Sequence, residues 1–178
     1  EAGWRMGSDG VRVKDGQRAS FLVYGLQTQE AQQYLQAMQA DLRRVGIDMR
    51  IQLWDATVGW GRLATQEFDA FVMSYPYVTA TDALSLYFHS RNRPTPNRMN
   101  WADPETGRAL EEAQIALDPA VRTAAIARVQ RIIAQNNVWV PIARQQLWVA
   151  SSQRVEGVRA HGIYGAGLYK GLDIRLTR

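Results

Sequence analysis

The chain has 178 residues, of which 46% are hydrophobic and 21% charged, a length and balance that suit one globular domain with a hydrophobic core. No apolar run approaches the roughly 18 residues of a membrane span, and the lack of cysteine excludes disulfides, thiolate zinc sites and cysteine nucleophiles. The formal net charge is +4, but only Arg91, Arg93 and Arg98 form a local cluster. A protein that binds nucleic acid usually gathers its basic residues on one face, so we expect no nucleic-acid partner.

The first part of the chain predicts a hairpin, a strand and a helix. Asp15 and Gly16 form a turn dipeptide, and the strand formers of residues 19–24 follow. Thr28 can cap a helix whose apolar residues recur at helical spacing, and Gly46 supplies its left-handed end.

The same alternation continues along the chain. A second strand is predicted at Asp48–Trp54, a short helix at about 57–65, and a third strand at 69–75. This β-α-β-α-β order predicts an α/β fold with a mostly parallel sheet flanked by helices.

The middle of the chain is predicted to be a loop followed by helices. Turn residues fill 76–81, a short apolar helix is predicted around 84–88, and the prolines and asparagines of 90–100 indicate an ordered loop. Asp103 and Asp118 each precede a proline, a pairing that caps and begins a helix.

The two ends of the chain carry weaker signals. Residues 138–151 are rich in strand formers, and a further strand is predicted at 172–176 after a glycine-rich stretch. The chain begins at Glu1, in the middle of a helix-like pattern, so we expect it to be a piece of a longer protein.

Catalytic and metal-binding motifs are missing from the sequence. His89 and His161 stand far apart and outside an HExxH pattern, and we interpret His89 as a helix-end cap or surface residue. Neither GxSxG nor GxGxxG occurs, and Glu111 and Glu112 fall on the solvent face of a predicted helix. We therefore expect no enzyme activity, no metal site and no cofactor.

Aromatic and polar residues follow the predicted strands at their carboxyl ends, the edge where open α/β sheets place ligands. Tyrosines, threonines and an acid fill residues 74–82 after the third strand, and two further candidates end the neighbouring strands. The predicted ligand-binding residues are Gln27, Trp54, Tyr75, Tyr77, Thr79 and Asp82. An ordinary loop at 74–82 is the alternative interpretation.

The order of several short motifs resembles a known family. Seven segments resemble, in the same order along the chain, the bacterial extracellular solute-binding proteins of family 5, which serve oligopeptide, dipeptide and nickel ABC transporters. These segments are residues 1–4, 39–47, 55–69, 88–90, 118–122, 140–142 and 154–158. The resemblance implies one lobe of a type II periplasmic-binding-protein fold, with residues 1–178 as a single C-terminal lobe. It also implies a periplasmic or other extracytoplasmic protein that binds a peptide-like solute together with its N-terminal lobe and delivers it to ABC permease subunits. Closure of the two lobes around the ligand is the motion that the family implies.

The sequence departs from the family at two ligand-binding positions. Dipeptide-binding members have a Trp and, three residues later, an Asp at the end of the third strand, where this chain has Ser74 and Tyr77. They also have an Arg in the loop after the first strand, whereas residues 25–28 of this chain contain no cation. A buried ammonium without a carboxylate partner is costly, so we expect a larger or modified peptide, or another organic solute. The alternative function is a ligand-sensing effector domain of a regulatory protein built on the same lobe.

Overall fold

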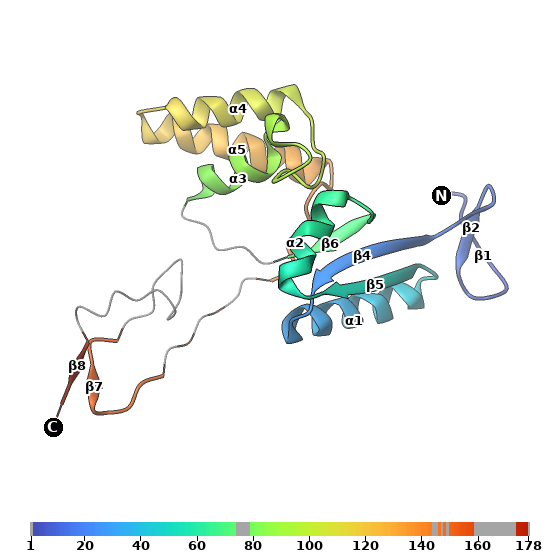
Figure 1. The fold of residues 1–178 in the computed structure, drawn as a ribbon. Helices are drawn as coiled ribbons and strands as arrows, with labels where there is room; N and C mark the ends of the chain where they lie inside the picture. Colours follow the sequence, from blue (N-terminus) through green and yellow to red (C-terminus); the bar gives the residue numbers. More distant parts are fainter. Residues whose placement is uncertain are drawn as a thin grey trace. The chain divides into compact units, whose positions relative to one another are not determined.

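The computed structural model describes residues 2–73, 79–143, 146, 148, 150–158 and 174–177. The contacts within the chain divide it into two compact units, Glu1–Tyr75 (unit 1) and Pro76–Arg178 (unit 2), which are drawn together in Figure 1. Among the described helices, none is long and apolar enough to cross a membrane. The assignment of residues 1–178 to a single C-terminal lobe stays a prediction.

Unit 1 begins with a small antiparallel sheet of three strands, β1 (Arg5–Met6), β2 (Arg12–Lys14) and β3 (Gln17–Arg18). Asp15 and Gly16 both have positive φ, 49° and 77°, which is the backbone of a tight hairpin turn. The predicted turn is therefore confirmed. Arg12 ties this sheet to the end of the first helix, because its Nε donates a hydrogen bond to the Val45 carbonyl at 2.7 Å.

The main sheet of unit 1 has the order β5-β4-β6 and is parallel throughout. Its strands are β4 (Ser20–Leu26), β5 (Asp48–Trp54) and β6 (Ala70–Val72), connected by helices α1 (Gln29–Arg44) and α2 (Ala56–Thr65). Figure 1 shows α1 on one face of this sheet and α2 on the other. The predicted parallel β-α-β-α-β unit is confirmed, although β6 ends at Val72 and residues 74 and 75 of the predicted third strand lie outside the described residues.

Helix α1 forms where the capping signals predicted it. Thr28 is the N-cap, and its Oγ1 accepts a hydrogen bond from Ala31 N at 3.1 Å. Gly46 follows the helix with φ of +79°, the left-handed conformation that suits glycine. The helix packs on one face of the sheet through a core of Val23, Leu35 and Met49.

Unit 2 contains α3 (Ala80–Phe88), the short 3-10 helix η1 (Ser90–Asn92), α4 (Pro104–Ile115) and α5 (Pro119–Gln135). Asp103 and Asp118 are the N-caps of α4 and α5, each followed by a first-turn proline, as predicted. Helices α4 and α5 lie side by side, and α3 packs against both (Figure 1). The core of this unit consists of Leu84, Phe88, Ala109, Leu110, Val129 and Ile133.

The prediction of a strand over residues 138–151 is wrong for the part of that stretch that the structure describes. Val140 and Trp148 are 67% and 85% exposed, and no described residue between 138 and 151 is in a strand. A strand forms only where a neighbour completes its backbone hydrogen bonds, and the described residues offer this stretch no such neighbour. The predicted terminal strand is confirmed in part, because β8 (Arg175–Leu176) pairs antiparallel with β7 (Val155–Glu156).

Candidate functional site

The candidate site in unit 1 is the edge of the parallel sheet where β4 and β5 end. The two strands end in register, with Leu26 opposite Trp54. Gln27 continues beyond β4 and donates its backbone N–H to the Trp54 carbonyl at 2.7 Å. The structure thus brings together two of the predicted ligand-binding residues, Gln27 and Trp54, and the Gln27 side chain is exposed.

Trp54 belongs to a row of aromatic rings on the face of the sheet opposite α1. Its ring meets the buried Tyr24 ring edge to face, with centroids 5.6 Å apart. Tyr24 in turn contacts Phe68 at 5.3 Å, and Phe68 contacts Phe71 at 5.4 Å. The Arg62 guanidinium of α2 lies 4.8 Å from the centroid of the Trp54 ring, close enough for a cation–π contact.

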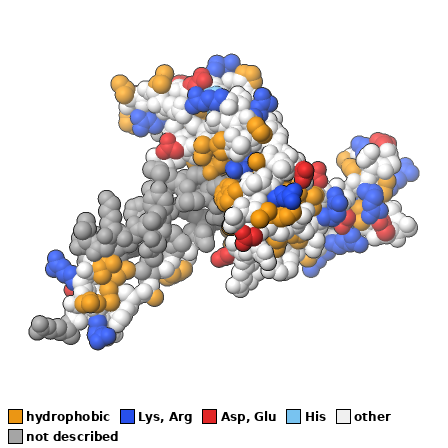
Figure 2. Space-filling model, viewed as in Figure 1, with side chains coloured by type: hydrophobic (Ala, Val, Ile, Leu, Met, Phe, Trp, Pro, Cys, Tyr) orange, Lys and Arg blue, Asp and Glu red, His pale blue; other side chains and the backbone are white. Residues whose placement is uncertain are grey.

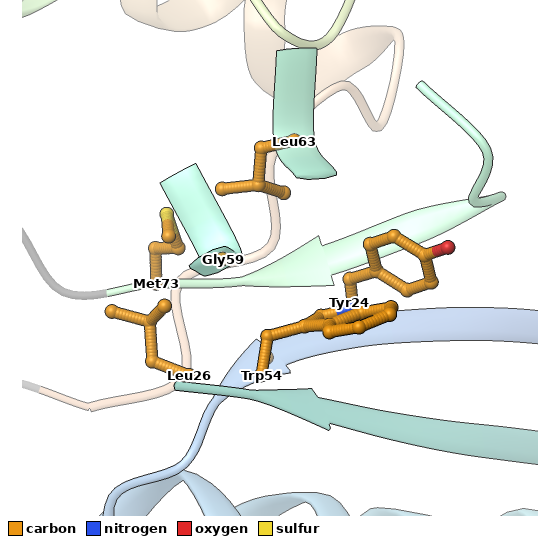
Figure 3. Close-up of a pocket in the computed structure, with 7 residues that line it drawn as sticks. Tyr24, Leu26, Trp54, Gly59, Leu63 and Met73 are labelled. Atoms are coloured by element: carbon orange, nitrogen blue, oxygen red, sulfur yellow. The ribbon is translucent and has the colours of Figure 1, made fainter. Parts of the chain in front are cut away.

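Closely packed side chains fill the space between this row and α2 (Figure 3). Tyr24 and Trp54 lie on the sheet side, and Gly59 and Leu63 face them from α2. The space is too narrow for a water molecule. Gly59 is required for this close packing, because a Cβ there would lie 2.6 Å from Leu26 Cδ2 and 3.3 Å from Trp54 Cβ. The aromatic row and α2 are therefore in close contact in this structure.

The indole N–H of Trp54 has no hydrogen-bond acceptor among the described residues, although the nitrogen is buried. A buried donor without an acceptor costs about 1–3 kcal/mol. The nitrogen is out of reach of solvent in this structure, so what Trp54 provides at the sheet edge is its ring, packed against Tyr24.

Sequence reasoning missed Tyr24, Phe68 and Phe71 as members of the aromatic row that includes Trp54. The signal for Tyr24 was present, because side chains alternate along a strand and Tyr24 must face away from Val23 and the α1 core. The signal for Phe68 was absent, since it precedes β6 and its direction depends on the tertiary fold.

Thr79 and Asp82, two further predicted ligand-binding residues, form the N-terminal cap of α3. Thr79 Oγ1 accepts a hydrogen bond from Asp82 N at 3.1 Å and donates one to Asp82 Oδ2 at 2.6 Å. Both residues are exposed, and the cap accounts for them as structural residues. Tyr75 and Tyr77 lie outside the described residues, and their part in a ligand site stays a prediction.

A polar cluster in unit 2 surrounds His89, which is 6% exposed. Arg91 N donates to His89 Nδ1 at 3.3 Å, so Nδ1 is an acceptor and the proton is on Nε2, which lies 3.2 Å from Glu111 Oε1. His89 caps both the end of α3 and the start of η1, which confirms its interpretation as a helix-end cap. In the described part of the chain, no group of three or more His, Cys, Asp or Glu residues could hold a metal ion.

No protein-family model matches the sequence. Protein XP55 of Streptomyces lividans is 31% identical over 137 residues, which are 75% of this chain and 25% of that protein. Di/tripeptide-binding protein 2 of Pseudomonas aeruginosa (strain UCBPP-PA14) is 25% identical over 131 residues, 70% of this chain and 24% of that protein. The chain thus spans about a quarter of the length of the curated relatives it matches.

Solved structures show the same fold. The oligopeptide-binding protein AppA of Bacillus subtilis, solved in complex with a nonapeptide, aligns with a TM-score of 0.74 and 19% identity over 99% of this chain and 36% of AppA. Other similar structures include a further peptide-binding protein and a nickel-transport protein of ABC transporters. The chain has the fold of the family 5 solute-binding proteins. The predicted α/β fold of the periplasmic-binding-protein type and the resemblance to this family are both confirmed.

Several of these relatives are named for the solutes that they bind and none for a reaction that it catalyses.

Proposed function

We propose that the chain is part of the substrate-binding component of an ABC importer, and that it binds a peptide-like or other organic solute outside the cytoplasmic membrane. The observation that carries the proposal is the sheet edge at Gln27 and Trp54, where an exposed polar side chain and an aromatic ring occur within a fold shared with peptide-binding proteins. Open α/β sheets bind ligands at this edge.

The chemistry of the edge favours a ligand larger than a dipeptide. Residues 25–28 contain no cation to bind a terminal carboxylate, and the aromatic row suits apolar side chains or peptide groups over a longer contact. A part in ligand binding is also proposed for Tyr75, Tyr77, Thr79 and Asp82. The N-terminal lobe of the same protein is proposed to cover the other side of the ligand. The bound solute is proposed to be delivered to ABC permease subunits.

Titration calorimetry of the full-length protein tests this proposal. Penta-alanine is expected to bind at micromolar concentration and dialanine to bind at least tenfold more weakly. Replacing Trp54 by Ala is expected to weaken penta-alanine binding tenfold or more, because it removes the ring that packs on Tyr24 at the end of β5.

The matched control is Trp4→Ala, which removes a partly exposed indole from the N-terminal segment of the same unit and should leave the affinity unchanged. A Trp54→Phe variant retains an aromatic ring beside Tyr24, so its affinity separates loss of the donor from loss of packing. Micromolar binding of dialanine, or equal affinities for wild type and Trp54→Ala, would refute the proposed ligand mode.

A further inference from the structure

The loop between α3 and α4 (residues 89–101, the basic loop) carries the local arginine cluster that the sequence analysis singled out. Figure 2 shows blue Lys or Arg side chains over unit 2, with red Asp or Glu side chains among them. Arg91 and Arg93 are both exposed on this loop. Neither forms an ion pair with any carboxylate in the described part of the chain, where Glu111 of α4 is paired with His89 and Glu112 with Arg128.

The backbone of the basic loop is held in place by buried side-chain hydrogen bonds. Asn97 is completely buried, and its Nδ2 donates to the carbonyls of His89 at 3.2 Å and Trp101 at 2.8 Å. Its Oδ1 accepts the Trp101 backbone N–H at 3.2 Å. Asn92 Nδ2 donates to the carbonyls of Ser85 and Leu86 at 2.9 and 3.1 Å, which fastens η1 to the end of α3.

The two arginines are therefore presented by a backbone that is already ordered. His89 fixes the Arg91 backbone N–H, and Arg93 Nε donates to the Ser90 carbonyl within the loop at 3.3 Å. Binding of a partner would therefore not require ordering of this loop, and a preformed site binds more tightly because less conformational entropy is lost. Guanidinium groups also match carboxylates in a two-bond geometry that lysine cannot offer.

We propose that the basic loop is a recognition surface for an acidic peptide segment, whose carboxylates pair with Arg91 and Arg93. The inference is independent of the proposed transport function, because it concerns a loop of unit 2 and the ligand edge described above belongs to unit 1. An anionic membrane is the weaker fit, since each basic residue near a membrane surface contributes only about 1 kcal/mol and membrane-binding segments use roughly four to eight of them.

The test measures binding of acetylated tetraglutamate amide to the full-length protein as a function of salt. Tetraglutamate is expected to bind at the basic loop with a strong salt dependence, whereas any tetraglutamine that binds at the proposed peptide site should do so without that salt dependence. The R91Q/R93Q variant should lose at least tenfold in affinity and most of the salt dependence, whereas R91K/R93K, which retains the charge but not the planar fork, should lose less.

The matched control is R44Q/R131Q, which removes the same charge from two exposed helix positions and should leave binding unchanged. Trp54→Ala should leave the salt-dependent part of tetraglutamate binding unchanged, which separates this surface from the proposed peptide site. The inference is overturned if R91Q/R93Q binds tetraglutamate as wild type does, if Trp54→Ala abolishes that binding, or if inorganic phosphate or phosphatidylserine vesicles bind the loop as tightly.

Discussion

Asn97→Ala is expected to lower the free energy of unfolding by about 3 kcal/mol, because it leaves several buried backbone groups without partners. The amide of Asn97 makes three hydrogen bonds in a position with no solvent exposure: two to carbonyls, of His89 and Trp101, and one from the Trp101 N–H. Urea denaturation followed by circular dichroism gives the change. Amide hydrogen exchange within residues 89–101 should accelerate under native conditions, since the loop loses its central anchor.

Asn136→Ala is the matched control for this prediction. The side chain of Asn136 is exposed at the end of α5 and makes one hydrogen bond, to the Ile132 carbonyl at 2.9 Å. Its loss should cost no more than about 1 kcal/mol. Equal costs for the two variants would mean that the buried amide does not hold the loop, and the preorganisation of Arg91 and Arg93 would then have no basis.

Leu35→Ala should destabilise unit 1 by about 3–4 kcal/mol, through lost burial and the cavity that remains. Leu35 is fully buried between α1 and the sheet, and its Cδ1 lies 2.8 Å from the point where a Cβ on Gly25 would stand. The Leu35 side chain is thus packed tightly against Gly25 of β4, one residue before this strand ends at the candidate ligand edge. We expect ligand affinity to fall with stability, because the same packing positions Gln27 and Trp54.

The same substitution at Leu117 provides the comparison. This leucine follows α4 and is 94% exposed, so Leu117→Ala should change the free energy of unfolding by less than about 0.5 kcal/mol. If Leu35→Ala and Leu117→Ala lower the free energy of unfolding by similar amounts, burial of Leu35 between α1 and the sheet does not contribute to stability.

The parts of the fold that the sequence predicted correctly depend on local signals. Thr28, Asp103 and Asp118 each cap the helix that follows them, and Asp15 with Gly16 forms the turn that their backbone preferences require. Strand β5 could be predicted at both ends because turn residues and a helix cap border a run of strand formers.

The parts that could not be predicted depend on residues distant in the sequence. The stretch 138–151 has the composition of a strand, but composition cannot supply the neighbouring strand that completes its hydrogen bonds. In the sequence, Asn97 is likewise one polar residue among several in a loop. Its role as a buried hydrogen-bonding residue follows only from the positions of His89 and Trp101.

The candidate site was predictable to a similar extent. Register between parallel strands brings Gln27 and Trp54 together, and the order of elements was enough to predict this. The contacts of Trp54 with Tyr24 and Arg62 depend on how α2 packs over the sheet, which the short pattern of that helix did not reveal. Thr79 and Asp82 have a capping role that composition alone could not separate from ligand binding.

Hydrogen exchange of the full-length protein with and without penta-alanine tests the central claim most directly. If the carboxyl edge of the parallel sheet contacts the solute, peptides that cover residues 24–28 and 52–56 should exchange more slowly when the ligand is bound, and Trp54→Ala should abolish that protection. Saturating ligand that leaves both segments unprotected, while it protects other parts of the protein, would contradict the account.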